Sequence, residues 1–134
     1  MLKDIKDPIS EGVTMAAVYE LNDEQEMVWN MYLLNYKDTI IDGVLITSKG
    51  YGEKDGQEVT TSILRHFVKE IPPQSVARIE PLQEDVFALI NEYFVTYYVG
   101  NTMYELKFIF DSYSISLKNT VLITFMGQQG IEVL

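Results

Sequence analysis

The chain of 134 residues contains no cysteine, only one histidine and only one tryptophan. Without cysteine there is no disulfide framework, no thiol nucleophile and no thiolate ligand for a metal. Zinc draws most of its ligands from cysteine and histidine, so the single imidazole of His66 does not indicate a zinc site. We therefore expect neither a bound metal nor a cofactor.

Basic residues are also scarce. Ten lysines and arginines face twenty aspartates and glutamates, which gives a formal net charge of −10 and a pI near 4.4. Proteins bind nucleic acids largely through cations that neutralise phosphates, so a nucleic-acid partner is not expected. The sequence has no run of about 20 apolar residues that would span a bilayer. Its first ten residues do not resemble a signal peptide. We expect a cytoplasmic protein that binds no membrane.

Length and composition indicate one folded domain. Hydrophobic residues make up 47% of the chain and charged residues 22%, which are ordinary values for a globular protein. A domain of this length buries a substantial core. Residues 1–12 are polar and contain Pro8 and Gly12. We interpret them as a loose lead-in to a single domain over residues 1–134.

The most informative stretch, residues 92–110, predicts a β-hairpin around Gly100-Asn101. Glycine at the first central position suits a type II′ turn, and a two-residue loop places Tyr97 opposite Tyr104. Side chains alternate along each strand, so one face of the hairpin is almost wholly apolar and belongs to a core. The other face keeps aromatic side chains, and its candidate interaction residues are Phe94, Tyr98, Met103 and Lys107.

About seven short strands are expected along the chain. Besides the hairpin, strand-like runs occupy residues 13–20, 27–36, 40–48, 75–80 and 120–126. This spacing predicts a mostly β fold, an antiparallel two-sheet sandwich of immunoglobulin-like type.

Two segments leave an alternative open. Residues 62–71 carry a helical stripe that Pro72-Pro73 would end, and residues 82–91 carry a similar stripe after Pro81. If both segments are helices, the fold is α+β, with one antiparallel sheet covered by two helices.

Few residues qualify as ligand candidates. Gly50 and Gly52 lie in a charged segment, residues 49–58, which reads as a loop with a turn at Asp55-Gly56. Its spacing is that of neither a P-loop nor a dinucleotide fingerprint. His66 and Glu70 lie four residues apart, a spacing that brings side chains together on a helix. No residues form a recognisable catalytic set.

Five short runs of the chain carry a resemblance, at residues 29–35, 43–52, 64–67, 79–81 and 91–93. They resemble a family of small uncharacterised bacterial proteins. Members of that family sometimes carry the name of a phenylalanyl-tRNA synthetase beta subunit. The resemblance covers most of residues 13–126 and implies an independently folded domain. It brings no catalytic motif, and the sequence shows no ATP- or tRNA-binding pattern.

Three functions are consistent with these features. The first is a non-catalytic β-sandwich module that binds a protein partner or itself through the second face of the hairpin. A homodimer is the simplest form of that hypothesis. The second is a small-molecule-binding protein or small enzyme with a pocket near His66. The third is an accessory role with a tRNA synthetase.

Overall fold

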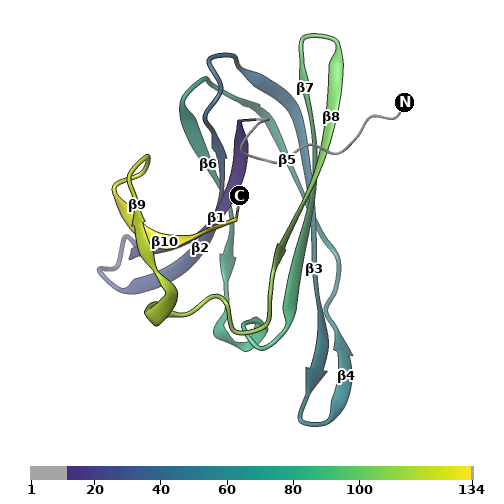
Figure 1. Cartoon of the computed structure of the whole chain (residues 1–134), viewed down its shortest axis with the longest axis vertical. Coiled ribbons are helices and arrows are strands. Elements are labelled where there is room, and N and C mark those ends of the chain that lie inside the picture. Colours follow the sequence, from purple (N-terminus) through teal and green to yellow (C-terminus); the bar gives the residue numbers. More distant parts are fainter. Residues whose placement is uncertain (1–11, 134) are drawn as a thin grey trace.

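The computed structural model of the chain describes residues 12–133 (Figure 1). Apart from Gly12, the expected lead-in at residues 1–12 lies outside this range. The described residues form ten strands and two short 3-10 helices, arranged as two antiparallel five-stranded sheets that pack as a sandwich. The predicted mostly β, two-sheet fold is therefore confirmed.

The first sheet, sheet A, has the strand order β6-β2-β1-β10-β9. Every pair of neighbours in it is antiparallel. Its members are β1 (Val13–Leu21), β2 (Met27–Asn35), β6 (Ser75–Leu82), β9 (Val121–Ile123) and β10 (Gln128–Val133).

The second sheet, sheet B, is built on the long strand β3. One edge of β3 pairs with β5 and, further along, with β4, while its other edge pairs with β7, which in turn pairs with β8. The β3–β4 hairpin extends beyond the rest of the sandwich (Figure 1). The members are β3 (Ile41–Lys54), β4 (Gln57–Thr60), β5 (Leu64–Ile71), β7 (Ile90–Val99) and β8 (Thr102–Phe110).

The strand order of the two sheets resembles that of an immunoglobulin-like sandwich. Strands β1, β2 and β6 are neighbours in the order of immunoglobulin strands A, B and E, and β3, β7 and β8 follow the order C, F and G. Strand β5 flanks β3 as an added strand does in variable-type domains. The described residues hold ten strands rather than about seven because β4, β5 and β10 add to the expected runs.

The α+β alternative is wrong. Neither residues 62–71 nor residues 82–91 form an α-helix: β5 occupies most of the first segment, and the second contains the 3-10 helix η1 (Glu84–Val86) and the start of β7. The helical stripe of the first segment arose because both faces of β5 carry apolar side chains. Phe67 is exposed on one face, whereas Val68 packs against the core from the other.

The charged segment 49–58 is a hairpin rather than a loop. Strand β3 continues to Lys54, and β4 begins at Gln57. The predicted turn at Asp55-Gly56 is present, with φ angles of 56° and 78°. Two successive positive φ angles are the mark of a type I′ turn, which matches the twist of the strands it joins.

The predicted register of the β7–β8 hairpin is confirmed. Val99 pairs with Thr102 and Tyr97 with Tyr104, and the register continues without a shift to Asn91 and Phe110. Gly100 has a φ of 59°, as the first central residue of a type II′ turn requires.

Inner faces of both sheets supply one main core. Tyr93 meets Phe110 edge to face with ring centroids 6.0 Å apart, and Trp29 meets Phe87 in the same way at 5.6 Å. Each fully buried large apolar side chain contributes about 1.5–3 kcal/mol relative to exposure. The largest fully buried side chains include Tyr93, Tyr97, Phe108, Phe110, Met15, Met31, Leu33 and Ile46.

We predict that Gly130→Ala destabilises the fold by about 1–3 kcal/mol. Gly130 lies in β10 opposite Val18, and a Cβ there would come within 2.6 Å of the Ala17 carbonyl oxygen and 2.8 Å of Ile123 Cδ1. A backbone carbonyl in a sheet ladder cannot move aside freely. Urea unfolding measures the loss, with Gln129→Ala at the exposed neighbouring position as the control. Equal midpoints for the two variants would contradict close packing of β10 on β1.

Candidate functional site

The outward-facing side chains of β3, β5, β7 and β8 form what we call the outer face of sheet B. Alternation places these side chains opposite the core residues of the same strands. Six large apolar members are between 39% and 67% exposed, an unusual concentration on one sheet of a single domain. They are Leu45, Phe67, Phe94, Tyr98, Met103 and Ile109.

All four predicted interaction residues lie on this face. Phe94, Tyr98 and Met103 are exposed by 39%, 41% and 49%, so no described part of the chain covers them fully. The Lys107 side chain is half exposed, and its Nζ lies 3.7 Å from a carboxylate oxygen of Glu92. The sequence left exposure and cover equally open, and the structure shows exposure.

Tyr98 lies over an irregularity in β3. The β3–β7 register shifts between Asp42 and Leu45, and Gly43 has a φ of 56° within that shift. A Cβ at Gly43 would lie 3.1 Å from Tyr98 Cδ1. Glycine therefore meets two needs here, the left-handed backbone and the space beneath the tyrosine ring.

Sequence reasoning missed the members of the face on β3 and β5. Leu45 and Phe67 are directly opposite each other, and Phe67 is the most exposed of the six apolar side chains at 67%. A strand reading of residues 64–71 with period two would have placed Phe67 on the outer side. The helical stripe in the same residues concealed that signal.

Charge is unevenly distributed over the outer face. Phe94 lies between Thr47 and Lys107 in one cross-strand row, and Thr47 in turn lies opposite Arg65. This row therefore sets an aromatic ring between two cations. At the Tyr98 end, Asp42 is opposite both Tyr98 and Glu70, so carboxylates border the face there.

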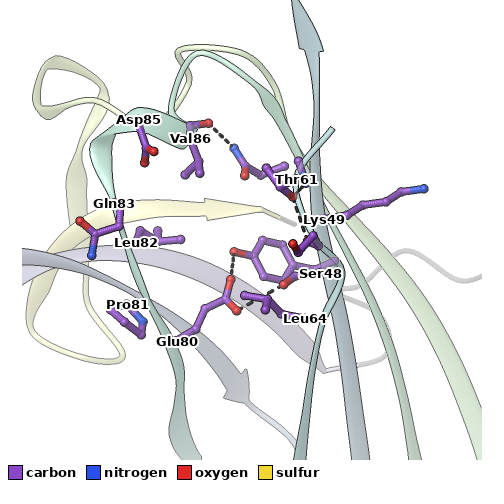
Figure 2. A pocket seen from close by; sticks show the side chains of 14 residues that line it. Ser48, Lys49, Thr61, Leu64, Glu80, Pro81, Leu82, Gln83, Asp85 and Val86 are labelled. Atoms are coloured by element: carbon purple, nitrogen blue, oxygen red, sulfur yellow. Dashed lines mark hydrogen bonds between the residues drawn. The ribbon is translucent and has the colours of Figure 1, made fainter. Parts of the chain in front are cut away.

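A second site lies where β6 of sheet A approaches sheet B, and its centre is the carboxylate of Glu80 (Figure 2). Glu80 Oε2 accepts a hydrogen bond of 2.7 Å from the Tyr93 hydroxyl, and Oε1 accepts one of 3.2 Å from the Ser48 hydroxyl. His66 Nε2 lies 2.7 Å from Oε1. Only 8% of Glu80 is exposed, so these donors replace the water that a buried carboxylate loses.

These residues do not form a catalytic triad. In a triad the imidazole lies between the nucleophile and the carboxylate. Here Ser48 and His66 both contact the same oxygen of Glu80, so the carboxylate lies between them. The two weak ligand candidates His66 and Glu70 both lie on β5, where an extended strand separates positions four apart by about 13 Å.

A cavity of about 290 Å³ opens beside Glu80. Figure 2 shows its lining, with Ser48 and Thr61 on one side and Glu80, Leu82 and Val86 on the other. The His66 side chain contacts Glu80 but does not line the cavity itself. The cavity therefore lies next to Glu80, the residue that His66 contacts.

The two glycine candidates have structural roles. The Gly50 N–H donates to Thr61 Oγ1 at 2.8 Å, and the Gly50 carbonyl accepts from the Thr61 N–H at 2.8 Å. Gly52 has a φ of 146° and lies under Leu89. The Gly50 amide is therefore engaged within the chain, and the pair does not form a phosphate cradle.

Within residues 12–133, no group of three or more His, Asp or Glu side chains is placed to hold a metal ion. No helix in the same range is long and apolar enough to cross a membrane. No protein-family model, curated protein or solved structure matches this chain.

Burial raises the pKa of the Tyr93 hydroxyl far above 10, and the neighbouring Glu80 charge and its hydrogen bond add to the shift. An unfolded tyrosine loses its proton near pH 10, whereas folded Tyr93 keeps it well above that pH. The stability linked to Tyr93 is thus complete below pH 10 and is lost as the pH rises further, by up to about 1.4 kcal/mol per pH unit.

We predict that Tyr93→Phe makes the alkaline loss of stability shallower by about that slope. The variant also lacks one hydrogen bond to Glu80, so its stability at pH 7 is lower than that of the wild type. Urea unfolding at intervals between pH 8 and pH 11 measures both quantities. A slope above pH 10 that is the same in both proteins would show that Tyr93 does not carry the linkage. Tyr32, whose pKa is raised to about 12 mainly by burial, leaves a residual slope in both proteins.

Proposed function

We propose that the chain is a cytoplasmic, non-catalytic interaction module that binds a protein partner through the outer face of sheet B. The observation that supports this proposal is the set of six exposed apolar side chains on one face of one sheet. Aromatic residues and methionine are enriched at protein interfaces, where they contribute area without burying charge. The cytoplasmic location rests on the sequence composition alone.

Charge narrows the kind of partner. The row that places Phe94 between Arg65 and Lys107 suits an apolar side chain flanked by carboxylates. Such a segment would fill the space over the ring, pair with Arg65 and compete with Glu92 for Lys107. A basic segment would meet like charges at the same row. The partner that we propose is therefore an acidic segment with an apolar anchor.

We predict that the immobilised full chain selects such segments from a displayed random-peptide library. The best peptide, synthesised and labelled, should lose at least about tenfold in affinity with Phe94→Ser and with Arg65→Glu, because anchor truncation and charge reversal each act at the same row. Fluorescence anisotropy measures the dissociation constants, and added salt should weaken binding.

Matched controls carry the same chemical changes away from the face. Leu122→Ser removes an exposed leucine of β9, and Lys118→Glu reverses an exposed charge in the 3-10 helix η2 (Leu117–Asn119). Both should bind the peptide as the wild type does. Selection of basic peptides, or equal losses in the control variants, would refute the proposal.

A second candidate function is binding of a small donor-rich ligand in the cavity beside Glu80. The observation that favours it is a buried carboxylate on the cavity wall. Ethanolamine, which carries an ammonium and a hydroxyl group, is a suitable probe. Saturable shifts of the Ser48, Gly50 and Asn91 amides in nitrogen-edited NMR spectra are expected, with their loss in Glu80→Gln. Shifts that do not saturate, or that persist in the variant, would exclude this site.

A further inference from the structure

Strand β8 forms one edge of sheet B, and it differs from the other sheet edges of the described residues. It pairs with β7 alone, over nine residues, without a register shift, and it contains neither proline nor glycine. Natural sheets protect their edges against pairing with prolines, irregularities or very short strands.

The remaining edges show such protection. At one side of sheet A, β9 has only three residues. At the other side, β6 contains Pro81 and its pairing with β2 shifts register at Met31. The far edge of sheet B is divided between β4 and β5. Strand β8 is therefore the long, regular edge that has none of these features.

The geometry of the hairpin identifies which backbone groups of β8 face outward. In a two-residue hairpin, Val99 and Thr102 form the hydrogen-bonded pair next to the turn. Hydrogen-bonded and non-hydrogen-bonded pairs then alternate, so the even-numbered residues of β8 bond to β7. The N–H and C=O groups of the odd-numbered residues point away from the sheet, and these residues are Met103, Glu105, Lys107 and Ile109.

We propose that two copies of the chain associate through β8, pairing antiparallel about a two-fold axis at Leu106. This register places Glu105 opposite Lys107 of the second copy, twice, and Met103 opposite Ile109, also twice. In this register the odd-numbered residues of the two copies lie opposite one another, so their outward N–H and C=O groups can form the backbone hydrogen bonds between the strands. Leu106 is the middle residue of β8, so all nine residues of the strand are paired.

Charge selects this register over its neighbours. A shift that centres the axis on Glu105 places two Glu105 carboxylates directly opposite each other, and a shift that centres it on Lys107 does the same with two ammonium groups. Like charges directly opposite are destabilising, whereas opposite charges and apolar pairs each contribute about 0.2–1 kcal/mol. Charged side chains, lysine above all, can protect a sheet edge, but the two outward charges of β8 have opposite signs and pair with each other in this register.

The dimer goes beyond the proposed partner binding and does not depend on it. In the paired arrangement the two copies of sheet B form one continuous sheet, and their outer faces become neighbours on the same side. The Phe94 ring remains open in both copies, because Phe94 lies on β7, one strand inward from the new junction. Lys107, at the β8 end of the same row, pairs with Glu105 of the second copy in the dimer.

Charge reversal tests the proposal with the full chain. Sedimentation velocity from about 1 μM to about 1 mM should show a monomer–dimer equilibrium for the wild type. Glu105→Lys and Lys107→Glu should each weaken the dimer at least about tenfold, because each places like charges opposite twice. The double variant Glu105→Lys/Lys107→Glu restores opposite charges and should restore the dimer.

Lys49→Glu is the matched control, because it reverses an exposed charge of the same outer face on β3, away from the edge. It should leave the dimer unchanged. A wild type that stays monomeric, a double variant that stays monomeric, or a dimer that Lys49→Glu disrupts would each overturn edge pairing. The last result would indicate face-to-face association instead. Peptide binding by the monomeric Glu105→Lys variant, which keeps Arg65, Phe94 and Lys107, would separate failure of the dimer from failure of the proposed function.

Because the chain contains no cysteine, a cross-linking test can establish the register. In the proposed dimer, Met103→Cys in one copy and Ile109→Cys in the other lie within disulfide distance, so a mixture of the two variants should form a covalent dimer under mild oxidation. Met103→Cys alone should not, because the two copies of position 103 lie about 20 Å apart along the strands. The opposite pattern would refute the register.

Discussion

The two-residue alternation of sheet B is the constraint on which the rest of the molecule depends. Tyr93, Val95 and Tyr97 point inward from β7 and, with their partners on β8, supply part of the main core. The same alternation sends Phe94 and Tyr98 outward. Because the backbone fixes both sets at once, the strand cannot move its outer aromatics inward without a register slip that would expose the core. The outer face therefore stays apolar without any change in the packing of the core.

Glu80 places a polar link beside that apolar core. The carboxylate belongs to β6 of sheet A, whereas the three side chains that contact it come from β3, β5 and β7 of sheet B. A buried carboxylate with its partners in place adds less stability than apolar packing, but it penalises any arrangement that separates the donors from the acceptor. The link therefore favours one relative position of the sheets and fixes the wall of the adjacent cavity.

The hairpin could be predicted from the sequence in full, whereas the Glu80 cluster could not be predicted at all, and the difference has a physical reason. Gly100-Asn101 sets the β7–β8 register locally, so a reader of the sequence can extend it residue by residue. The contacts of Glu80 join residues 13 to 32 positions away along the chain, and only the tertiary fold brings them together. The helix alternative for residues 62–71 arose because Phe67 and Val68 are apolar on opposite faces of β5, and this pattern has the same spacing as a helical stripe.

The outer face and the free edge share one strand, and this gives the two proposals a common physical basis. Met103 and Ile109 are side chains of the outer face, while their backbone groups line the edge. Pairing at β8 would not bury the face but would double its width, so a partner with two acidic segments could contact both copies. Linked contacts of this kind raise overall affinity through effective concentration, even where each contact alone is weak. A strongly acidic chain that keeps cations beside Phe94 is suited to such a role, because its net charge of −10 opposes nonspecific binding of acidic segments elsewhere on its surface.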